Sequence, residues 1–198
     1  MARGLPAPDD AVPIDGRCFA YVFPCRWEDH CKIGFSNDPL GRIGALHPRW
    51  YEFFDVGHGT LVEAESVRDA RDLELELRAS LREYNAPAPL TISVPAGGKT
   101  EWFRGVGTLL QQRIAGLAER GYRVYQLDRW LRTMLVARSD RLHEWSLAML
   151  GVDELDGLVG RTPAQRKLRD ALDAYRALDI DIAALLPDAV LDWYRRQG

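Results

Sequence analysis

Two short runs of aromatic and β-branched residues constrain this chain most: CFAYVF at 18–23 and KIGFS at 32–36. Such residues favour extended backbone, and the short polar connection at 24–31 lets the second run turn back on the first. The pattern therefore predicts a β-hairpin. The two-residue period of a strand places these side chains on shared faces: Phe19, Tyr21 and Phe23 in the first strand, and Lys32, Gly34 and Ser36 in the second.

A tyrosine, a lysine and a glycine near the core of one hairpin are an uncommon combination. Two interpretations follow from the pattern. Tyr21 and Lys32 are either ordinary residues of a half-buried pair of strands, or they form the floor of a site in which a phenol and an ammonium face the same ligand.

Composition predicts an ordinary globular protein with one good core and room for a small second one. The formal net charge of the 198 residues is −3, so no field of the whole molecule draws the chain onto nucleic acid, and any phosphate binding must come from local arrangement. No apolar run approaches the roughly 18 residues that span a bilayer. Residues 1–16 carry prolines without a hydrophobic signal core, which predicts a flexible arm and a cytoplasmic protein that makes no membrane contact.

The three cysteines are an odd number, which argues against a disulfide framework and predicts free thiols. An alternative is a zinc site, because thiolates and imidazoles suit that ion. Cys25, His30 and Cys31 of the hairpin connection would supply ligands, joined by Cys18 or His47.

After the hairpin, Asp38 and Pro39 are suited to begin a short helix over 39–46. Its apolar stripe leaves Arg42 at the margin, where the side chain is placed to reach over the edge of the sheet. The aromatic and β-branched run at 50–56 predicts a third strand, ended by a Gly-His-Gly sequence around His58.

The segment 65–84 has the most informative pattern of the chain. Apolar residues recur at three- and four-residue steps, which predicts an amphipathic helix. Glu74 falls inside the apolar arc, next to Ala70 and Leu77. A carboxylate there must be paired, protonated or bound to a cation, since leaving it bare costs several kcal/mol. Glu74 is therefore either a structural ion-pair partner or a metal ligand.

The rest of the chain predicts an irregular connection that leads into Trp102 and Phe103, and then helices. We place the end of a first domain, 17–120, after a helix over 106–120, and assign 121–198 to a helical domain or extension. The helices expected in this extension cover 125–150, 162–178 and 187 onward. From Arg123 to Gly198, 12 basic residues balance 12 acidic ones, which is more typical of a packing or protein-interaction module than of a nucleic-acid arm.

The order of these features resembles the GIY-YIG endonuclease superfamily, in particular a phage- and fungus-associated branch whose second signature is Lys-Ile-Gly. The resemblance covers about Phe19 to Phe103, and nothing after Arg120. Five elements carry it in order: FAYV at 19–22, KIG at 32–34, S-x-D-P-x-x-R at 36–42, A-x-x-L-E-x-x-L at 70–77 and TEWF at 100–103.

The resemblance implies a small antiparallel three-stranded sheet flanked by helices, and a nuclease that hydrolyses phosphodiesters with one divalent cation, Mg²⁺ or Mn²⁺. Tyr21 would deprotonate or orient the attacking water, Lys32 would stand where most members have a second tyrosine, Arg42 would contact the scissile phosphate, and Glu74 would hold the metal. His47 and His58 are secondary candidates, because neither stands at the position of a family histidine.

General chemistry agrees with these roles. Phosphodiester cleavage develops negative charge, which a guanidinium and a metal stabilise. One carboxylate with waters is a normal Mg²⁺ site. A phenol needs a nearby cation to serve as a base, and Lys32 could lower the pKa of Tyr21, or could itself activate water if burial lowered its own pKa. The sequence leaves both alternatives open.

We therefore expect a metal-dependent endonuclease acting on DNA, with RNA not excluded. One alternative is a binding module that kept the fold but lost turnover, with the 121–198 helices engaging a protein partner. Another is a toxin or an effector nuclease delivered to another cell, in which those helices serve for loading or for recognition by a protective partner.

Overall fold

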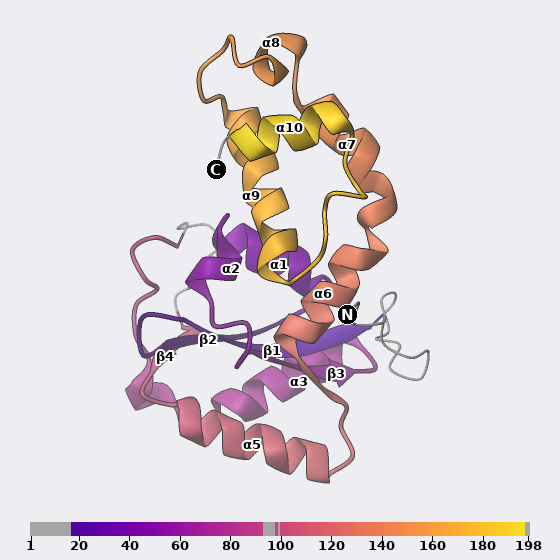
Figure 1. The fold of residues 1–198 in the computed structure, drawn as a ribbon. Coiled ribbons are helices and arrows are strands. Elements are labelled where there is room, and N and C mark those ends of the chain that lie inside the picture. The colour runs from indigo at the N-terminus through magenta and orange to yellow at the C-terminus, as the bar shows by residue number, and fades with distance from the viewer. Residues whose placement is uncertain (1–16, 93–97, 99, 197–198) are drawn as a thin grey trace.

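The computed structural model describes residues 17–92, 98 and 100–196, and the predicted arm at 1–16 lies outside them. Within the described part, the chain forms one antiparallel sheet of five strands in the order β4-β2-β1-β3-β5, with helices on both faces (Figure 1). The strands are β1 (Cys18–Pro24), β2 (His30–Ser36), β3 (Thr60–Ala64), β4 (Trp102–Arg104) and β5 (Val124–Gln126).

The predicted α/β class is confirmed, and the predicted count of three strands is wrong for the described residues. β4 and β5 have three residues each, which is too few for a two-residue alternation to stand out in a sequence. β5 also begins after residue 120. The sheet therefore takes its last strand from the segment that was expected to be all-helical.

β1 and β2 form the predicted hairpin. Tyr21 lies opposite Gly34, and Phe23 lies opposite Lys32. Directly opposed residues of antiparallel strands project from the same face of the sheet. Tyr21 and Lys32 therefore share one face, as one of the two interpretations of the hairpin requires.

Helix α1 (Pro39–Leu46) begins as predicted. The side chain of Asp38 accepts a hydrogen bond from the backbone N–H of Gly41 at 3.0 Å, and Pro39 occupies the first turn. The predicted strand at 50–56 is wrong, because Trp50–Phe53 forms the helical turn α2 and Phe54 makes a single β-bridge with Cys25. Aromatic residues favour strands because they fit half-buried surfaces, and this helical turn buries Trp50 and Tyr51 as well as a strand would.

Helix α3 (Val67–Arg78) is capped by Ser66, whose hydroxyl accepts from the backbone N–H of Asp69 at 3.1 Å. It is shorter than the predicted 65–84, because Ser80 adopts a positive φ of 61° that no α-helix accommodates. A short 3-10 helix, η2 (Arg82–Tyr84), follows. The predicted buried position of Glu74 among Ala70, Leu73 and Leu77 is confirmed.

The two faces of the sheet have separate hydrophobic clusters. On one face, α3 and α5 (Gly107–Glu119) cover Ala20, Val22 and Ile33. On the other face, Phe19, Tyr21 and Phe23 join the larger cluster, which continues through α1, α2 and the C-terminal helices (Figure 1). The alternation along β1 thus assigns its aromatic side chains to the face that carries Lys32.

The C-terminal segment stands on that second face as a stack of helices (Figure 1). These are α6 (Leu127–Ala137), α7 (Leu142–Met149), α8 (Val152–Leu155), α9 (Pro163–Ala177) and α10 (Asp188–Arg196). The single long helix expected over 125–150 is interrupted by the 3-10 turn η3 (Ser139–Arg141), where the hydroxyl of Ser139 bonds the carbonyl of Val136 at 2.7 Å. The predicted capping box at Thr162 and Gln165 is confirmed.

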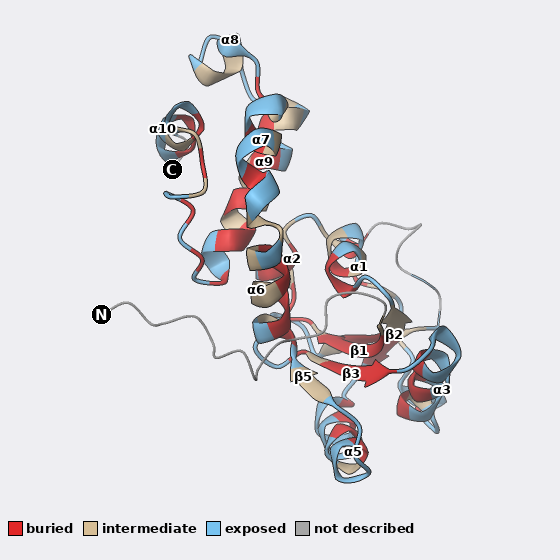
Figure 2. Ribbon diagram, turned by 90° about the vertical axis from the view of Figure 1, so that its right-hand side faces the viewer, coloured by how far each residue is buried: buried red, intermediate tan, exposed pale blue. Residues whose placement is uncertain are grey.

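Burial is continuous from the sheet into these helices (Figure 2). Trp130 of α6 packs edge-on against Phe19 at a centroid distance of 5.4 Å, and Trp193 of α10 belongs to the same cluster. No helix of the described residues is long and apolar enough to cross a membrane.

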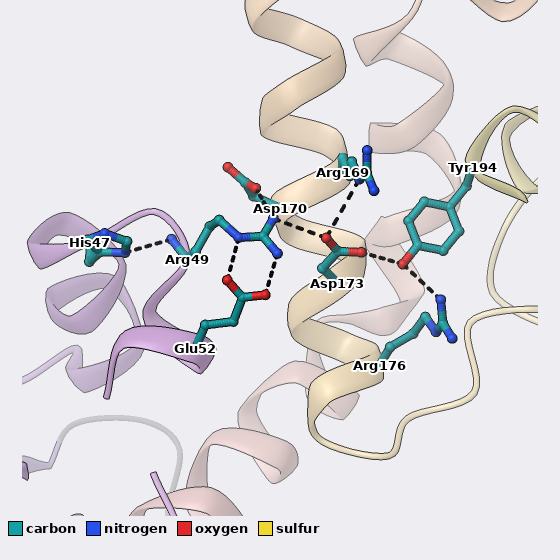
Figure 3. A network of polar contacts seen from close by, with 8 residues as sticks. All are labelled: His47, Arg49, Glu52, Arg169, Asp170, Asp173, Arg176 and Tyr194. Atoms are coloured by element: carbon teal, nitrogen blue, oxygen red, sulfur yellow. Dashed lines mark hydrogen bonds and ion pairs between the residues drawn. The ribbon is translucent and has the colours of Figure 1, made fainter. Parts of the chain in front are cut away.

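One polar network ties α2 to α9 (Figure 3). The guanidinium of Arg49 binds both carboxylate oxygens of Glu52, and its Nη1 also reaches Asp170 at 3.0 Å and Asp173 at 3.2 Å. Asp173 in turn accepts a hydrogen bond from the hydroxyl of Tyr194 at 2.5 Å. Arg49 therefore connects α2 to α9 and, through Asp173, to α10.

Candidate active site

Tyr21 lies in the middle of β1 and is 1% exposed. Its ring stacks on Phe23 at a centroid distance of 4.1 Å, and its hydroxyl accepts a hydrogen bond from Nε of Arg42 at 3.2 Å. A Cβ atom added to Gly34 would lie 2.4 Å from this hydroxyl. Only a residue without a side chain leaves room for the phenol there, so the glycine of the KIG element is a packing requirement of Tyr21.

Lys32 of β2 is completely buried although its side chain ends in an ammonium group. Its Nζ binds Oε2 of Glu101 at 2.5 Å and lies 5.3 Å from the ring centroid of Trp102. The pairing of β2 with β4 brings this partner close, since Lys32 lies opposite Trp102 and the N–H of Ile33 donates to the carbonyl of Glu101 at 2.9 Å. The charge of Lys32 is thus held by a carboxylate 69 positions away.

Arg42 joins the two groups. It projects from α1 onto the edge of the site, where Nε binds Tyr21 and Nη2 lies 3.9 Å from the Glu101 carboxylate. Tyr21, Arg42, Glu101 and Lys32 therefore form one continuous row of polar contacts. The side chain of Arg42 is 29% exposed, whereas Tyr21 and Lys32 are buried. Solvent or a ligand therefore reaches Arg42 more readily than the other two residues.

Glu74 comes from the helix on the other face of the sheet. Its Oε1 accepts a hydrogen bond from Arg78 at 2.5 Å, and Arg78 also donates to the carbonyl of Thr100 at 2.8 Å. Thr100 directly precedes Glu101, so Glu74 reaches the row of polar contacts through Arg78 and this backbone. Glu74 therefore forms an ion pair with Arg78, as one of its two interpretations predicts. The role of Glu74 as a metal ligand stays a prediction.

The pKa of Tyr21 is raised above its ordinary value of 10.0, mainly by burial. The charge and hydrogen bond of Arg42 oppose this rise, and the charges of Glu101 and Glu74 add to it. Arg42 is thus a cation that favours the phenolate here. A buried phenol with a raised pKa is protonated at neutral pH and serves best as a hydrogen-bonding group.

The pKa of Lys32 is lowered from its ordinary value, because burial disfavours the ammonium. The hydrogen bond and charge of Glu101 oppose that effect. Glu101 is the residue that the sequence analysis missed as a member of the site. The sequence signal for Glu101 is its place in the TEWF element, as a carboxylate immediately before the edge strand β4.

The two secondary candidates lie apart from this row of contacts. Nδ1 of His47 accepts from the backbone N–H of Arg49 at 3.2 Å in the network of Figure 3. The ring of His47 stacks on Phe53. Burial lowers the pKa of His47. His58 is 72% exposed and pairs with Asp55 at 2.8 Å. Neither histidine contacts Tyr21, Lys32 or Arg42 in the described structure.

The structure does not support the alternative zinc site. All three cysteines are free and buried, and burial raises the pKa of Cys25 and Cys31 to about 12 each. Among the described residues, no group of three or more His, Cys, Asp and Glu side chains is placed to hold a metal ion.

A hard divalent cation such as Mg²⁺ needs fewer protein ligands than zinc does. Mg²⁺ commonly binds one or two carboxylates and keeps several of its waters. Glu74 uses Oε1 for Arg78, and a carboxylate has a second oxygen, so the donor chemistry fits such an ion. Glu101 provides another carboxylate at the same row of contacts.

No family model, no curated protein and no solved structure matches this chain.

Proposed function

We propose that this protein is an endonuclease of GIY-YIG type that hydrolyses phosphodiester bonds of DNA with the help of Mg²⁺ or Mn²⁺. The observation that carries the proposal is the hydrogen bond between Arg42 and the buried hydroxyl of Tyr21, within a row that also contains Lys32 and Glu101. A phenol, a guanidinium and an ammonium converging from β1, α1 and β2 are the groups that the family resemblance implies.

Arg42 is suited to bind the scissile phosphate. Its guanidinium is partly exposed, and its Nη2 lies 3.9 Å from the carboxylate of Glu101. A phosphate oxygen replacing that long contact gains a charge-assisted hydrogen bond, which is roughly twice as strong as a neutral one. Lys32 and Arg42 both place a positive charge in this row of contacts.

Tyr21 is suited to orient the attacking water, because its protonated hydroxyl is fixed by Arg42 from one side and by the packing of Gly34 and Phe23 from the others. Orientation of this kind lowers a barrier by holding the reacting atoms in place. Glu74 would hold the divalent cation, which when bound stabilises the charge that develops on phosphate.

Plasmid nicking tests this function. With Mg²⁺, wild type is expected to convert supercoiled plasmid to the nicked form, and Glu74→Ala is expected to have lost this activity. Glu76→Ala is the matched control, since Glu76 lies on the same helix but is exposed and pairs with Arg120 at 2.8 Å. Equal nicking by Glu74→Ala and wild type would exclude Glu74 as the metal ligand. Parallel reactions with single-stranded RNA decide between the two nucleic acids.

A second candidate is a binding module without turnover. One observation favours it: the groups proposed for catalysis are paired within the chain, Lys32 with Glu101 and Glu74 with Arg78. Such pairs neutralise the charges that a catalytic site would apply to phosphate and metal. Negligible nicking by both wild type and Glu74→Ala, with both proteins folded, would establish this candidate in place of the enzyme.

A further inference from the structure

Two adjoining hollows lie where the C-terminal helices meet the sheet domain. The larger, of about 640 Å³, has an apolar floor that includes Leu40 and Gly44 of α1 and Ala174 of α9. The smaller, of about 280 Å³, opens beside Gln165 and Trp193. Arg166 and Asp170 line both. We call this continuous surface the α1–α9 groove.

The rim of the α1–α9 groove is strongly basic. Among its described lining residues, six are basic and one, Asp170, is acidic. The basic residues are Arg49, Arg138, Arg161, Arg166, Lys167 and Arg169. The whole chain has a net charge of −3, and the segment from Arg123 to the C-terminus has a net charge of zero. The groove is therefore more positively charged than the chain as a whole.

Much of this charge is not neutralised locally. Asp170 is bound to Arg49 at 3.0 Å. The ion pairs within the described part of the chain include none made by Arg161, Arg166 or Lys167. These three side chains are also exposed, and the sequence from Gly157 to Arg169 contains no acidic residue. An anion in the groove would therefore meet three exposed cations, and the lining carboxylate of Asp170 is already bound to Arg49.

The groove lies next to the proposed catalytic arginine. Leu40 and Gly44 face the groove, and Arg42 lies between them in the sequence, on the other side of α1 at about 100° per residue. A helix is about 10 Å wide, which corresponds to about three base pairs of B-DNA. Arg138 pairs with Asp38, the capping residue of α1, at 3.4 Å. One duplex could therefore contact Arg42 and the basic rim together.

We propose that the α1–α9 groove binds the sugar-phosphate backbone of duplex DNA and holds it across α1 at the site of cleavage. The inference rests on the proposed function. Phosphates would pair with the exposed cations of the rim, and deoxyribose carbons would lie on the apolar floor. The C-terminal helices would then add affinity to the contact that Arg42 makes.

Equilibrium binding of a short labelled DNA duplex, measured without divalent cations so that no cleavage occurs, tests the proposal. The variant is Arg166→Ala with Lys167→Ala. Each lost phosphate contact lowers the slope of log K against log salt by about 0.9, so we expect a decrease of about 1.8 and an affinity loss on the order of tenfold to a hundredfold at about 0.1 M salt. Arg68→Ala with Arg71→Ala is the matched control, because these exposed cations lie on α3, across the sheet.

The proposal requires a selective loss in the groove variant. It is overturned if the groove variant binds DNA as wild type does, if the α3 variant loses as much, or if wild type binds poly-glutamate and not DNA, which would indicate an acidic protein partner. The binding and nicking experiments test the two proposals separately. DNA binding through the groove without nicking contradicts only the proposed activity, whereas nicking with unchanged binding in the groove variant contradicts only this inference.

Discussion

Glu101 and the buried Lys32 form a partly buried ion pair at 2.5 Å that links β2 to the start of β4. Burial lowers the pKa of Lys32, and the hydrogen bond and charge of Glu101 oppose that shift. Removing one partner of a buried pair leaves the other charge without compensation, which costs more than the pair itself contributes. The pair therefore controls both the stability of this sheet edge and the protonation of Lys32.

Glu101→Gln is expected to lower the free energy of unfolding by about 3 kcal/mol, because it leaves the Lys32 ammonium buried beside a neutral amide. Urea unfolding monitored by tryptophan fluorescence measures the change. Glu101→Gln combined with Lys32→Met is the control, since replacing a buried pair by apolar groups is often neutral. A double variant as unstable as the single one would show that Glu101 stabilises the fold by another route.

Gly34→Ala should destabilise the protein by about 1–3 kcal/mol, since its Cβ would lie 2.4 Å from the hydroxyl and 2.6 Å from Cζ of the buried Tyr21 ring. Thermal unfolding provides the measurement. Gly116→Ala in α5 is the matched control, because its Cβ would meet nothing within 4 Å, and it should be neutral or stabilising. The loss should shrink in a Tyr21→Ala background, and equal losses in both backgrounds would exclude the clash as the cause.

The stability of the protein should fall as pH rises above about 10, in part through Tyr21. The pKa of Tyr21 is raised in the folded state, so the unfolded chain loses this proton first as pH rises. The stabilising contribution of the protonated Tyr21 is complete below the ordinary pKa of 10.0. This contribution is lost as pH rises toward the pKa of the folded state. Tyr21→Phe should therefore show a shallower fall between about pH 9 and about pH 11 in urea unfolding. Identical slopes would mean that Tyr21 ionises equally in both states.

Arg49→Lys is expected to destabilise the protein by about 1–2 kcal/mol, because a single ammonium cannot replace a guanidinium that binds Glu52, Asp170 and Asp173 together (Figure 3). Hydrogen exchange should show the largest loss of protection in α9. Arg195→Lys is the control, since Arg195 makes one exposed pair with Asp192 at 3.6 Å and should tolerate the change. Unchanged exchange in α9 would show that apolar packing alone docks this helix.

If the proposed activity is correct, Arg42→Lys should lower plasmid nicking by about a hundredfold while duplex binding stays near the wild-type value. Lysine keeps the positive charge but has no Nε to bind Tyr21, and it cannot contact a phosphate with two parallel hydrogen bonds. Nicking rates under single-turnover conditions measure the effect. Wild-type rates in Arg42→Lys would remove Arg42 from the catalytic set.

Local patterns in the sequence predicted the parts of the fold that depend on backbone period. The alternation of β1 assigned Tyr21 to the face shared with Lys32, Asp38 predicted the beginning of α1, and the three- and four-residue steps of α3 predicted the burial of Glu74. Each of these features involves residues close in sequence, where side-chain direction follows directly from strand or helix geometry.

Patterns of the same kind gave wrong results where packing competed with local preference. The aromatic residues at 50–53 suit a strand, but in α2 they are buried as a helical turn. The apolar period over 125–150 continues through η3, where the backbone turns and the helix ends. Three-residue strands such as β4 and β5 carry no usable period at all.

The sequence by itself determined the α/β class, the hairpin with its shared face, and the capped helix that carries Arg42, because those depend on neighbours a few positions apart. The tertiary structure alone decided that Glu101 neutralises Lys32, that β5 completes the sheet, and that the C-terminal helices form a basic groove beside α1. These features join segments many tens of residues apart. Their contacts arise only when the chain folds back on itself, and no local period encodes them.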